Sequence, residues 1–125
     1  MNDRFRIRAW HEPTQKMFEV HCFTAEQVFE NTLDGVGTSP TNPANTNDCV
    51  LMQCTGLKDK TGRLIYEGDV VALNDDEIAV ISWKDIIARF IIESEDVQAD
   101  FDNFYPYELE IVGNIYETPQ LLGDE

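Results

Sequence analysis

Apolar and polar residues alternate at the start of the chain. In RFRIRAW, residues 4–10, the apolar side chains fall on one face and the arginines, with Trp10, on the other. A period of two predicts a half-buried strand. A polar turn containing Pro13 follows, and KMFEVHCF then predicts a second strand, so we expect residues 4–23 to form a hairpin.

A helix-like segment and a loop come next. Residues 24–33, TAEQVFENTL, begin with Thr24 as a favourable N-cap and place Gln27 where a capping box needs Glu or Gln, so we expect a short helix. Residues 34–48, DGVGTSPTNPANTND, are rich in Gly, Pro, Asn, Thr and Ser and offer nothing to a core. They predict a long flexible loop within the domain, either disordered or partner-binding.

Short apolar strands separated by turns fill the second half. VLMQCTG, DVVAL, IAVISW and ARFIIES each predict a strand, and NDDE predicts a hairpin turn. Gly62 and Gly68 stand where a turn or bulge needs positive φ, and Gly113 predicts a bend in the last strand. The expected fold is mainly β, a β-rich α+β domain. It would hold a small bent sheet or SH3-like barrel element, an N-terminal hairpin and at most one or two short helices.

Composition fits a single domain spanning residues 1–125. The hydrophobic fraction of 42% is too high for a disordered chain. No apolar run approaches the roughly 18 residues that cross a bilayer, and the N-terminus lacks the apolar region of a signal peptide. We therefore expect a cytoplasmic protein without membrane contact.

The cysteines and histidines predict neither a disulfide framework nor a zinc site. The cysteines are odd in number and form no CxxC pair, and the two histidines are far from the later cysteines. We expect Cys22 and Cys54 to be small buried hydrophobic residues on strands.

The charge of the chain is strongly asymmetric. Twenty-four acidic and nine basic residues give a net charge of −15, and no Lys or Arg follows Arg89. Such a chain repels nucleic acid at long range and favours a basic partner. Within residues 93–110 acids alternate with aromatic side chains that could anchor a partner. The candidate interaction surface consists of Glu95, Asp96, Asp100, Phe101, Asp102, Phe104, Tyr105 and Tyr107. Alternatively, these aromatics belong to the core and the acids form a solvated rim.

Three segments carry a family resemblance: FRIRAW at 5–10, MQCTGLKDKTGRLIYEGDVV at 52–71 and VGNIYETPQLL at 112–122. They resemble the YopX family, small proteins of bacteriophages and prophages. Arg-Ile interrupts the first segment where the family pattern usually runs straight through. The resemblance implies a mostly β fold with an SH3-like element and a phage or prophage origin, and it brings no activity, cofactor or catalytic residue. Cys54 stands where an aromatic is common in the family, which argues for packing and against a reactive thiol.

The central segment is therefore interpreted as architecture. Its apolar residues would fill the core and its glycines would let the backbone turn, with residues 58–60 as a solvated turn tip. The expected core positions are Leu51, Leu57, Leu64, Ile65 and Val70. A phosphate-binding loop is excluded because the spacing GxxxxGK[ST] is absent.

Catalysis is not predicted. NDDE at 74–77 suits a hairpin turn, and DFD at 100–102 has no base nearby, so a metal-dependent hydrolase is disfavoured. No Ser-His-Asp set is suggested either. We expect no enzyme activity, no metal and no cofactor.

Four residues offer an alternative, basic face: Arg4, Arg6, Arg8 and Trp10. The arginines could contact nucleic-acid phosphates while Trp10 stacks on a base. We favour the competing interpretation, in which these arginines pair with Glu108 and Glu110 across strands.

Together these features predict a non-catalytic phage or prophage accessory protein in the cytoplasm of its bacterial host. It would act through contacts with an unknown protein partner and would self-associate as a homo-oligomer. One alternative is an acidic DNA mimic or capture protein for a basic nucleic-acid-binding partner, which would need acids spaced along an exposed ridge like DNA phosphates. The other is direct nucleic-acid binding through the arginine face, which the net charge disfavours.

Overall fold

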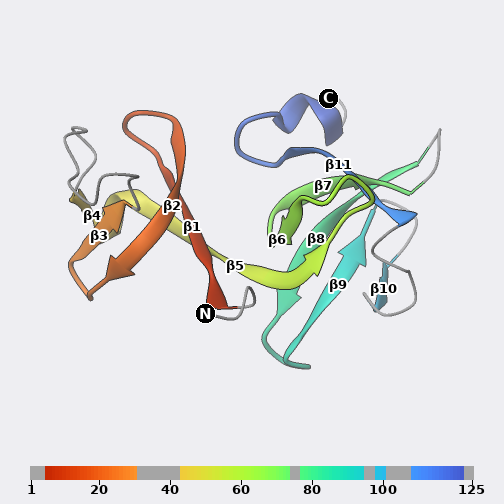
Figure 1. Cartoon of the computed structure of the whole chain (residues 1–125), viewed down its shortest axis with the longest axis horizontal. Helices are drawn as coiled ribbons and strands as arrows, with labels where there is room; N and C mark the ends of the chain where they lie inside the picture. Colours follow the sequence, from red (N-terminus) through yellow and green to blue (C-terminus); the bar gives the residue numbers. More distant parts are fainter. Residues whose placement is uncertain (1–4, 31–42, 74–76, 95–97, 101–107, 123–125) are drawn as a thin grey trace.

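The computed structural model describes residues 5–30, 43–73, 77–94, 98–100 and 108–122, and within them it consists of two antiparallel sheets (Figure 1). The first sheet has the strand order β4-β3-β2-β1-β5-β6 and the second has the order β10-β9-β8-β7-β11. The strands are β1 (Ile7–His11), β2 (Lys16–Phe23), β3 (Gln27–Glu30), β4 (Ala44–Asn45), β5 (Cys49–Lys58), β6 (Leu64–Tyr66), β7 (Asp69–Ala72), β8 (Ile78–Lys84), β9 (Arg89–Glu93), β10 (Gln98–Asp100) and β11 (Glu110–Asn114). Two 3-10 helices, η2 (Thr46–Asp48) and η5 (Pro119–Leu122), complete the described elements.

The chain forms two lobes joined by β5, each with its own core (Figure 1). The N-terminal lobe comprises β1–β4 and the first half of β5, and its core is Ala9, Phe18, Val28 and Ala44. The C-terminal lobe comprises β6–β11, and its core is Ile65, Val71, Ala79, Ile81, Ile92, Leu109 and Ile111. In Figure 1, β5 runs from one lobe to the other, so a single strand links the two cores.

The mainly β prediction is confirmed. The β1–β2 hairpin forms with Ala9 opposite Phe18, and the apolar runs in the second half form β7, β8 and β9. Gly62 and Gly68 take φ values of 92° and 90°, as their turn positions predicted. No helix among the described residues is long and apolar enough to span a membrane.

The helix expected at 24–33 is wrong, because residues 27–30 form β3. The hydroxyl of Thr24 does accept hydrogen bonds from the main-chain N–H groups of Glu26 and Gln27, at 3.2 and 3.0 Å. However, the Thr24 N–H also donates to the Gln27 carbonyl at 2.8 Å, which closes a turn into a strand. Val28 is then fully buried between β2 and β4. Burial of this one side chain outweighs a weak local helix signal.

The predicted loop at 34–48 lies partly outside the described residues. Its last five residues form β4 and η2, and β4 pairs with β3. Ala44 is buried in the N-terminal core. The expectation that this segment offers nothing to a core is therefore wrong at Ala44. The Gly, Pro, Asn, Thr and Ser residues around this small apolar residue gave the segment the composition of a loop. Residues 74–76 of the predicted NDDE turn also lie outside the described residues.

The turn between β5 and β6 is the expected solvated tip at Lys58 and Lys60, which are exposed, but not at Asp59. Asp59 is buried, and its carboxylate accepts four hydrogen bonds, from the Thr61 N–H and hydroxyl, the Arg63 N–H and the Ile111 N–H, at 2.7–3.0 Å. The Lys60 N–H donates to the Leu109 carbonyl at 2.9 Å. This turn therefore covers the outer edge of β11 and ties the two ends of the C-terminal lobe together.

The other expected core positions differ in burial. Ile65 and Val70 are fully buried, whereas Leu57, on the outer part of β5, is 45% exposed. Cys54 is buried as expected, but Cys22 is exposed because β2 carries it past the end of the N-terminal core. All three cysteines are free thiols.

The bend at Gly113 is confirmed as a break in the register of β11 with β7. A Cβ atom at this position would collide with the hydroxyl of Thr118 and lie 2.7 Å from Leu121. Glycine thus lets the C-terminal turn and η5 pack directly on β11, so the TPQLL segment packs.

Candidate functional site

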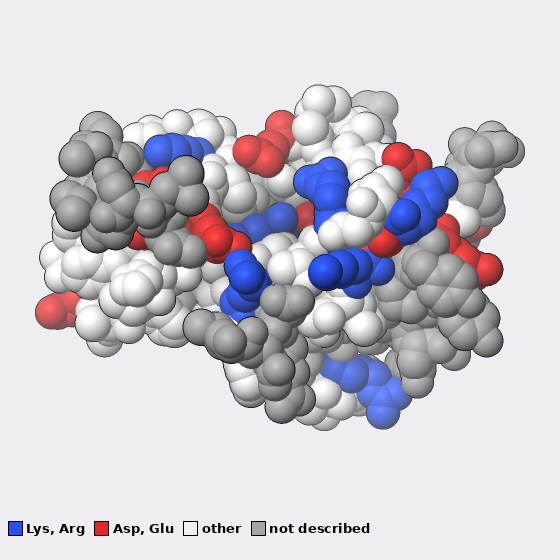
Figure 2. Space-filling model, viewed as in Figure 1, with Lys and Arg blue, Asp and Glu red and all other residues white. Residues whose placement is uncertain are grey.

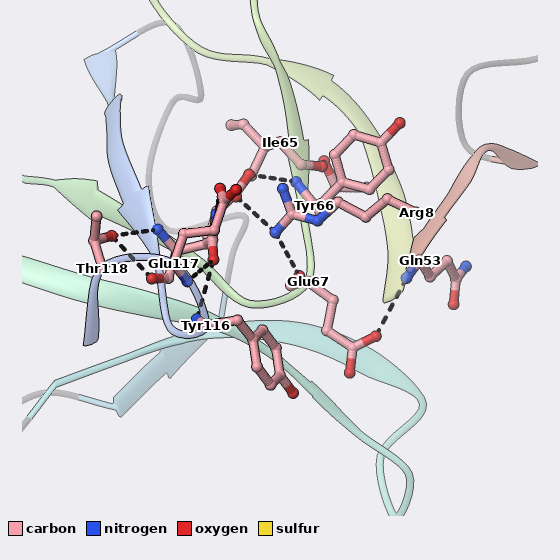
Figure 3. Close-up of polar contacts among 11 residues, drawn as sticks. Arg8, Gln53, Ile65, Tyr66, Glu67, Tyr116, Glu117 and Thr118 are labelled. Carbon is pink, nitrogen blue, oxygen red and sulfur yellow. Dashed lines mark hydrogen bonds and ion pairs between the residues drawn. The ribbon is translucent and has the colours of Figure 1, made fainter. Parts of the chain in front are cut away.

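The polar centre of the molecule lies where the two lobes meet. Arg8 extends from β1, and its Nη2 contacts Asp69 Oδ1 at 2.8 Å and donates to the Glu67 carbonyl at 3.2 Å (Figure 3). Its guanidinium also lies over the ring of Tyr66, 4.8 Å from the centroid. One side chain of the N-terminal lobe thus contacts three residues in and around the β6–β7 turn.

Burial and a second hydrogen bond hold the Asp69 carboxylate in place for this contact. Its side chain is only 2% exposed, and Oδ2 accepts a hydrogen bond from the Tyr66 N–H at 2.8 Å. Burial raises the pKa of Asp69 above its ordinary value, against the opposing effects of Arg8 and of the Tyr66 hydrogen bond. Burial also raises the pKa of Tyr66 to about 12, so its phenol stays neutral at physiological pH.

A stack of two aromatic rings forms the other side of the junction. Trp10 packs on Tyr116 with ring centroids 5.7 Å apart and planes inclined by 26°, and its indole N–H donates to Glu12 at 3.0 Å. Asn114 fixes the turn that carries Tyr116, because its side-chain oxygen accepts from the N–H groups of Tyr116 and Glu117 at 3.0 and 2.8 Å. Burial, followed by the nearby carboxylates of Glu67 and Glu12, raises the pKa of Tyr116.

A hollow of about 240 Å³ opens beside this junction. It lies along β8 from Val80 to Lys84, and the β6–β7 turn and the C-terminal turn border it. Its side-chain walls include Met52, Glu67, Trp83, Lys84 and Tyr116. A second, wider hollow of about 460 Å³ lies on β1 and β2 of the N-terminal lobe, between Phe5 and Phe23.

Most of the acidic surface predicted from sequence lies outside the described residues. This holds for Glu95, Asp96, Phe101, Asp102, Phe104, Tyr105 and Tyr107. Asp100 is the described member, and it pairs with Ile91 at the end of β10.

The three described residues of the predicted basic face do not share one surface. Arg4 lies outside the described residues, and Arg6 forms an exposed ion pair with Glu19 at 3.0 Å. Arg8 and Trp10 point into the lobe junction, where Trp10 is only 3% exposed and already stacks on Tyr116. The interpretation that the arginines pair within the chain holds for Arg6 and Arg8.

The partners expected for these arginines were wrong, however. The structure pairs Arg8 with Asp69 and Arg6 with Glu19, whereas Glu110 lies 3.4 Å from Lys60. The two-residue spacing of Glu108 and Glu110 suggested a cross-strand match, but β1 pairs with β2 and β5 and never with β11.

Sequence reasoning missed the junction as a site. Gly68 was predicted only as a turn or bulge position, and Arg8 and Trp10 only as part of a basic face. A signal was present, because all three segments that carry the family resemblance supply residues here: Arg8 and Trp10, then Met52 and 66–69, then 114–117.

The chemistry of the junction is that of a brace. Its carboxylates and amides bind one another or the main chain, and the buried Nε of Arg8 is the side-chain polar atom of the described residues left without a hydrogen-bond partner. Within the described part of the chain, no three His, Cys, Asp or Glu side chains are grouped to hold a metal ion.

Fold and junction together define a class, small β proteins in which an N-terminal hairpin lobe is joined to a second lobe built on a five-stranded antiparallel sheet. The chain belongs to the YopX family, whose profile, described as YopX protein, matches residues 6–123. No curated protein matches the sequence.

Two crystal structures have the same fold. Protein EF1440 from Enterococcus faecalis shares 26% sequence identity, with a TM-score of 0.66 over 94% of this chain and 97% of that one. Protein yopX from Bacillus subtilis shares 17% identity, with a TM-score of 0.57 over 100% of this chain and 99% of that one. Both likenesses extend over essentially whole chains, so the three proteins share an overall fold.

Proposed function

We propose that this protein is a non-catalytic accessory protein of a phage or prophage that acts in the host cytoplasm through protein–protein contacts. The turn between β8 and β9 carries the proposal. Ile86 is 98% exposed and Ile87 is 49% exposed at its tip. Neighbouring exposed apolar side chains of this size are typical anchors of protein interfaces.

The base of this turn is fixed, which keeps the two isoleucines in solvent. Trp83 and Phe90 pair across β8 and β9, with centroids 5.0 Å apart in an edge-to-face arrangement. The Trp83 indole N–H also donates to Asp85 at 2.6 Å. In Figure 1 this hairpin projects at the lower edge of the C-terminal lobe. A prearranged apolar tip loses little conformational entropy when a partner binds.

The charge distribution supports capture of a basic protein more than mimicry of DNA. On the face in Figure 2, described acidic residues lie scattered among Lys and Arg side chains and form no continuous ridge. A mimic needs acids in a regular row, since DNA presents about one charge per 1.7 Å of its axis. The net charge of −15 still favours a positively charged partner.

Affinity capture from the native host, read by mass spectrometry, tests the proposal. The double variant Ile86→Ser/Ile87→Ser should lose the partner that the parent protein retains. Val112→Ser is the matched control, since Val112 is a 41% exposed residue on β11 and its loss should leave capture unchanged. Unaltered capture by the double variant, with circular dichroism showing an intact fold, would remove the turn as the contact.

The acidic segment is tested separately. Reversal of Glu95, Asp96, Asp100 and Asp102 to Lys should weaken capture in low salt if this segment steers the partner. We propose that homo-oligomers would form through the same contact, with a second copy of the chain as the partner. Light scattering of the parent and the isoleucine variant shows whether this is so.

A further inference from the structure

We propose that the hollow beside the lobe junction receives a lysine or arginine side chain from an extended segment of the partner protein. This inference rests on the proposed function and names the chemistry of its partner. The hollow measures about 240 Å³. Pockets that take drug-sized molecules or cofactors measure roughly 300–1,000 Å³. The space therefore suits one side chain better than a whole cofactor.

Glu67 supplies the charge that selects a cation. Its side chain lines the hollow, and Oε1 accepts one hydrogen bond from the Gln53 N–H at 3.3 Å. No ion pair joins Glu67 to a Lys or Arg of the described residues. The two cations nearby are already paired: Arg8 with Asp69 at 2.8 Å, and Lys84, which lines the same hollow, with Glu93 at 3.3 Å. Glu67 is thus left as the carboxylate that an incoming cation would neutralise.

Aromatic and thioether groups in the lining suit the methylene chain of such a guest. Trp83 and Tyr116 are both lining residues, and Met52 adds a polarisable thioether. Figure 3 shows the side chains of Glu67 and Tyr116 pointing to the same side of the ribbon, away from Arg8. Aromatic rings beside a carboxylate are a favourable setting for a cation, and this chain already places Arg8 over Tyr66 in that way.

The extension of β8 beyond the end of β7 explains why the cation should arrive on a peptide. The register of β7 with β8 ends at Val80, and the Gly68 N–H extends it to the Ile81 carbonyl at 2.8 Å. Backbone groups on one side of a strand recur at every second residue, so those of Trp83 face the hollow beyond the end of β7. An extended segment could pair there while its basic side chain meets Glu67.

The same strand leads to the apolar turn of the proposed function. Trp83 and Lys84 border the hollow, and Ile86 and Ile87 follow them in the chain after one residue, Asp85. A partner anchored on the isoleucines would therefore lie within reach of the hollow. The isoleucine turn would supply an apolar anchor, and the hollow would supply a charge-selective contact.

Peptide binding followed by NMR tests the site without the partner. The probes are acetyl-Ala-Lys-Ala-amide and its norleucine counterpart, which keeps the methylene chain and lacks the charge. The lysine probe should shift the signals of Gly68, Trp83 and Tyr116 saturably, and the norleucine probe should bind at least about tenfold more weakly. Equal binding of both probes, or no saturable shift with lysine, overturns the proposal on the parent protein alone.

Glu67→Gln isolates the carboxylate. Glutamine keeps an acceptor for the Gln53 N–H, and we expect affinity for the lysine probe to fall about tenfold. Glu110→Gln is the matched control, because it removes the same charge from a residue outside the hollow. Equal weakening in both variants would mean general attraction by the net charge and no site. Host capture that persists without specific lysine binding would refute this site while leaving the proposed function intact.

Discussion

Asp59 in the β5–β6 turn accepts a hydrogen bond from the main-chain N–H of Ile111, 52 residues later, at 2.9 Å. Both residues are buried, so this hydrogen bond is shielded from water and joins the β5–β6 turn to β11. A carboxylate that replaces a strand neighbour also protects the edge of β11 from pairing with another chain.

Replacement of Asp59 should therefore be costly. We expect Asp59→Ala to lower the free energy of unfolding by about 3 kcal/mol or more, because the buried Ile111 N–H and the turn N–H groups lose their acceptor. Urea unfolding measures the change. Asp48→Ala, at an exposed residue of η2, is the control and should stay within about 0.5 kcal/mol of the parent. A similar small effect at Asp59 would contradict the bracing role.

The same carboxylate should give an acid-sensitive contribution to stability. Burial by itself would raise the pKa of Asp59, but the hydrogen bonds from Ile111, Thr61 and Arg63 outweigh it and hold the pKa below the ordinary value of 3.8. Because the unfolded chain binds the proton more readily, this contribution is complete above pH 3.8 and is lost as the pH falls through the lower, folded value.

Unfolding measured against pH checks this sign. The stability difference between the parent protein and Asp59→Asn should be constant above the ordinary carboxyl pKa and should narrow as the solution is acidified below it. A difference that widens on acidification would show that the folded protein prefers the protonated acid.

Arg8 and Asp69 should behave as a coupled pair. Each single substitution, Arg8→Met or Asp69→Asn, leaves a buried charge without its partner and should cost about 3–5 kcal/mol. The double variant should cost clearly less than the sum, since no uncompensated charge remains. Asparagine keeps an acceptor for the Tyr66 N–H, so that hydrogen bond is not part of the measured coupling. Additive costs in a double-mutant cycle would show that the pair does not brace the lobes.

Gly68→Ala should destabilise the protein by about 1 kcal/mol or more, because an L side chain at φ 90° is strained. The new Cβ would also lie 3.1 Å from Met52 Sδ. Gly62→Ala is the matched comparison, with φ 92° and nothing within 4 Å of the added atom. Thermal unfolding of the two variants separates strain from crowding, and equal losses would mean that Met52 moves aside freely.

The sequence by itself determined β1, β7–β9 and the glycine turns. The alternation in β1, the apolar runs of β7–β9 and the positive φ at Gly62 and Gly68 follow from local rules, since strand period and glycine conformation depend on near neighbours. Local rules failed at residues 27–30, where the burial of Val28 converted a helix signal into β3.

Only the tertiary structure decided the roles of the polar residues. Asp59 and Asp69 sit in turns, where acids are normally solvated, and their burial depends on Ile111 and Arg8 from distant strands. Likewise, Glu67 became a candidate cation receptor because β8 extends beyond the end of β7 and a hollow lies there, lined by Glu67. Charge pairing is set by which strands become neighbours in space, and a two-residue spacing cannot specify that.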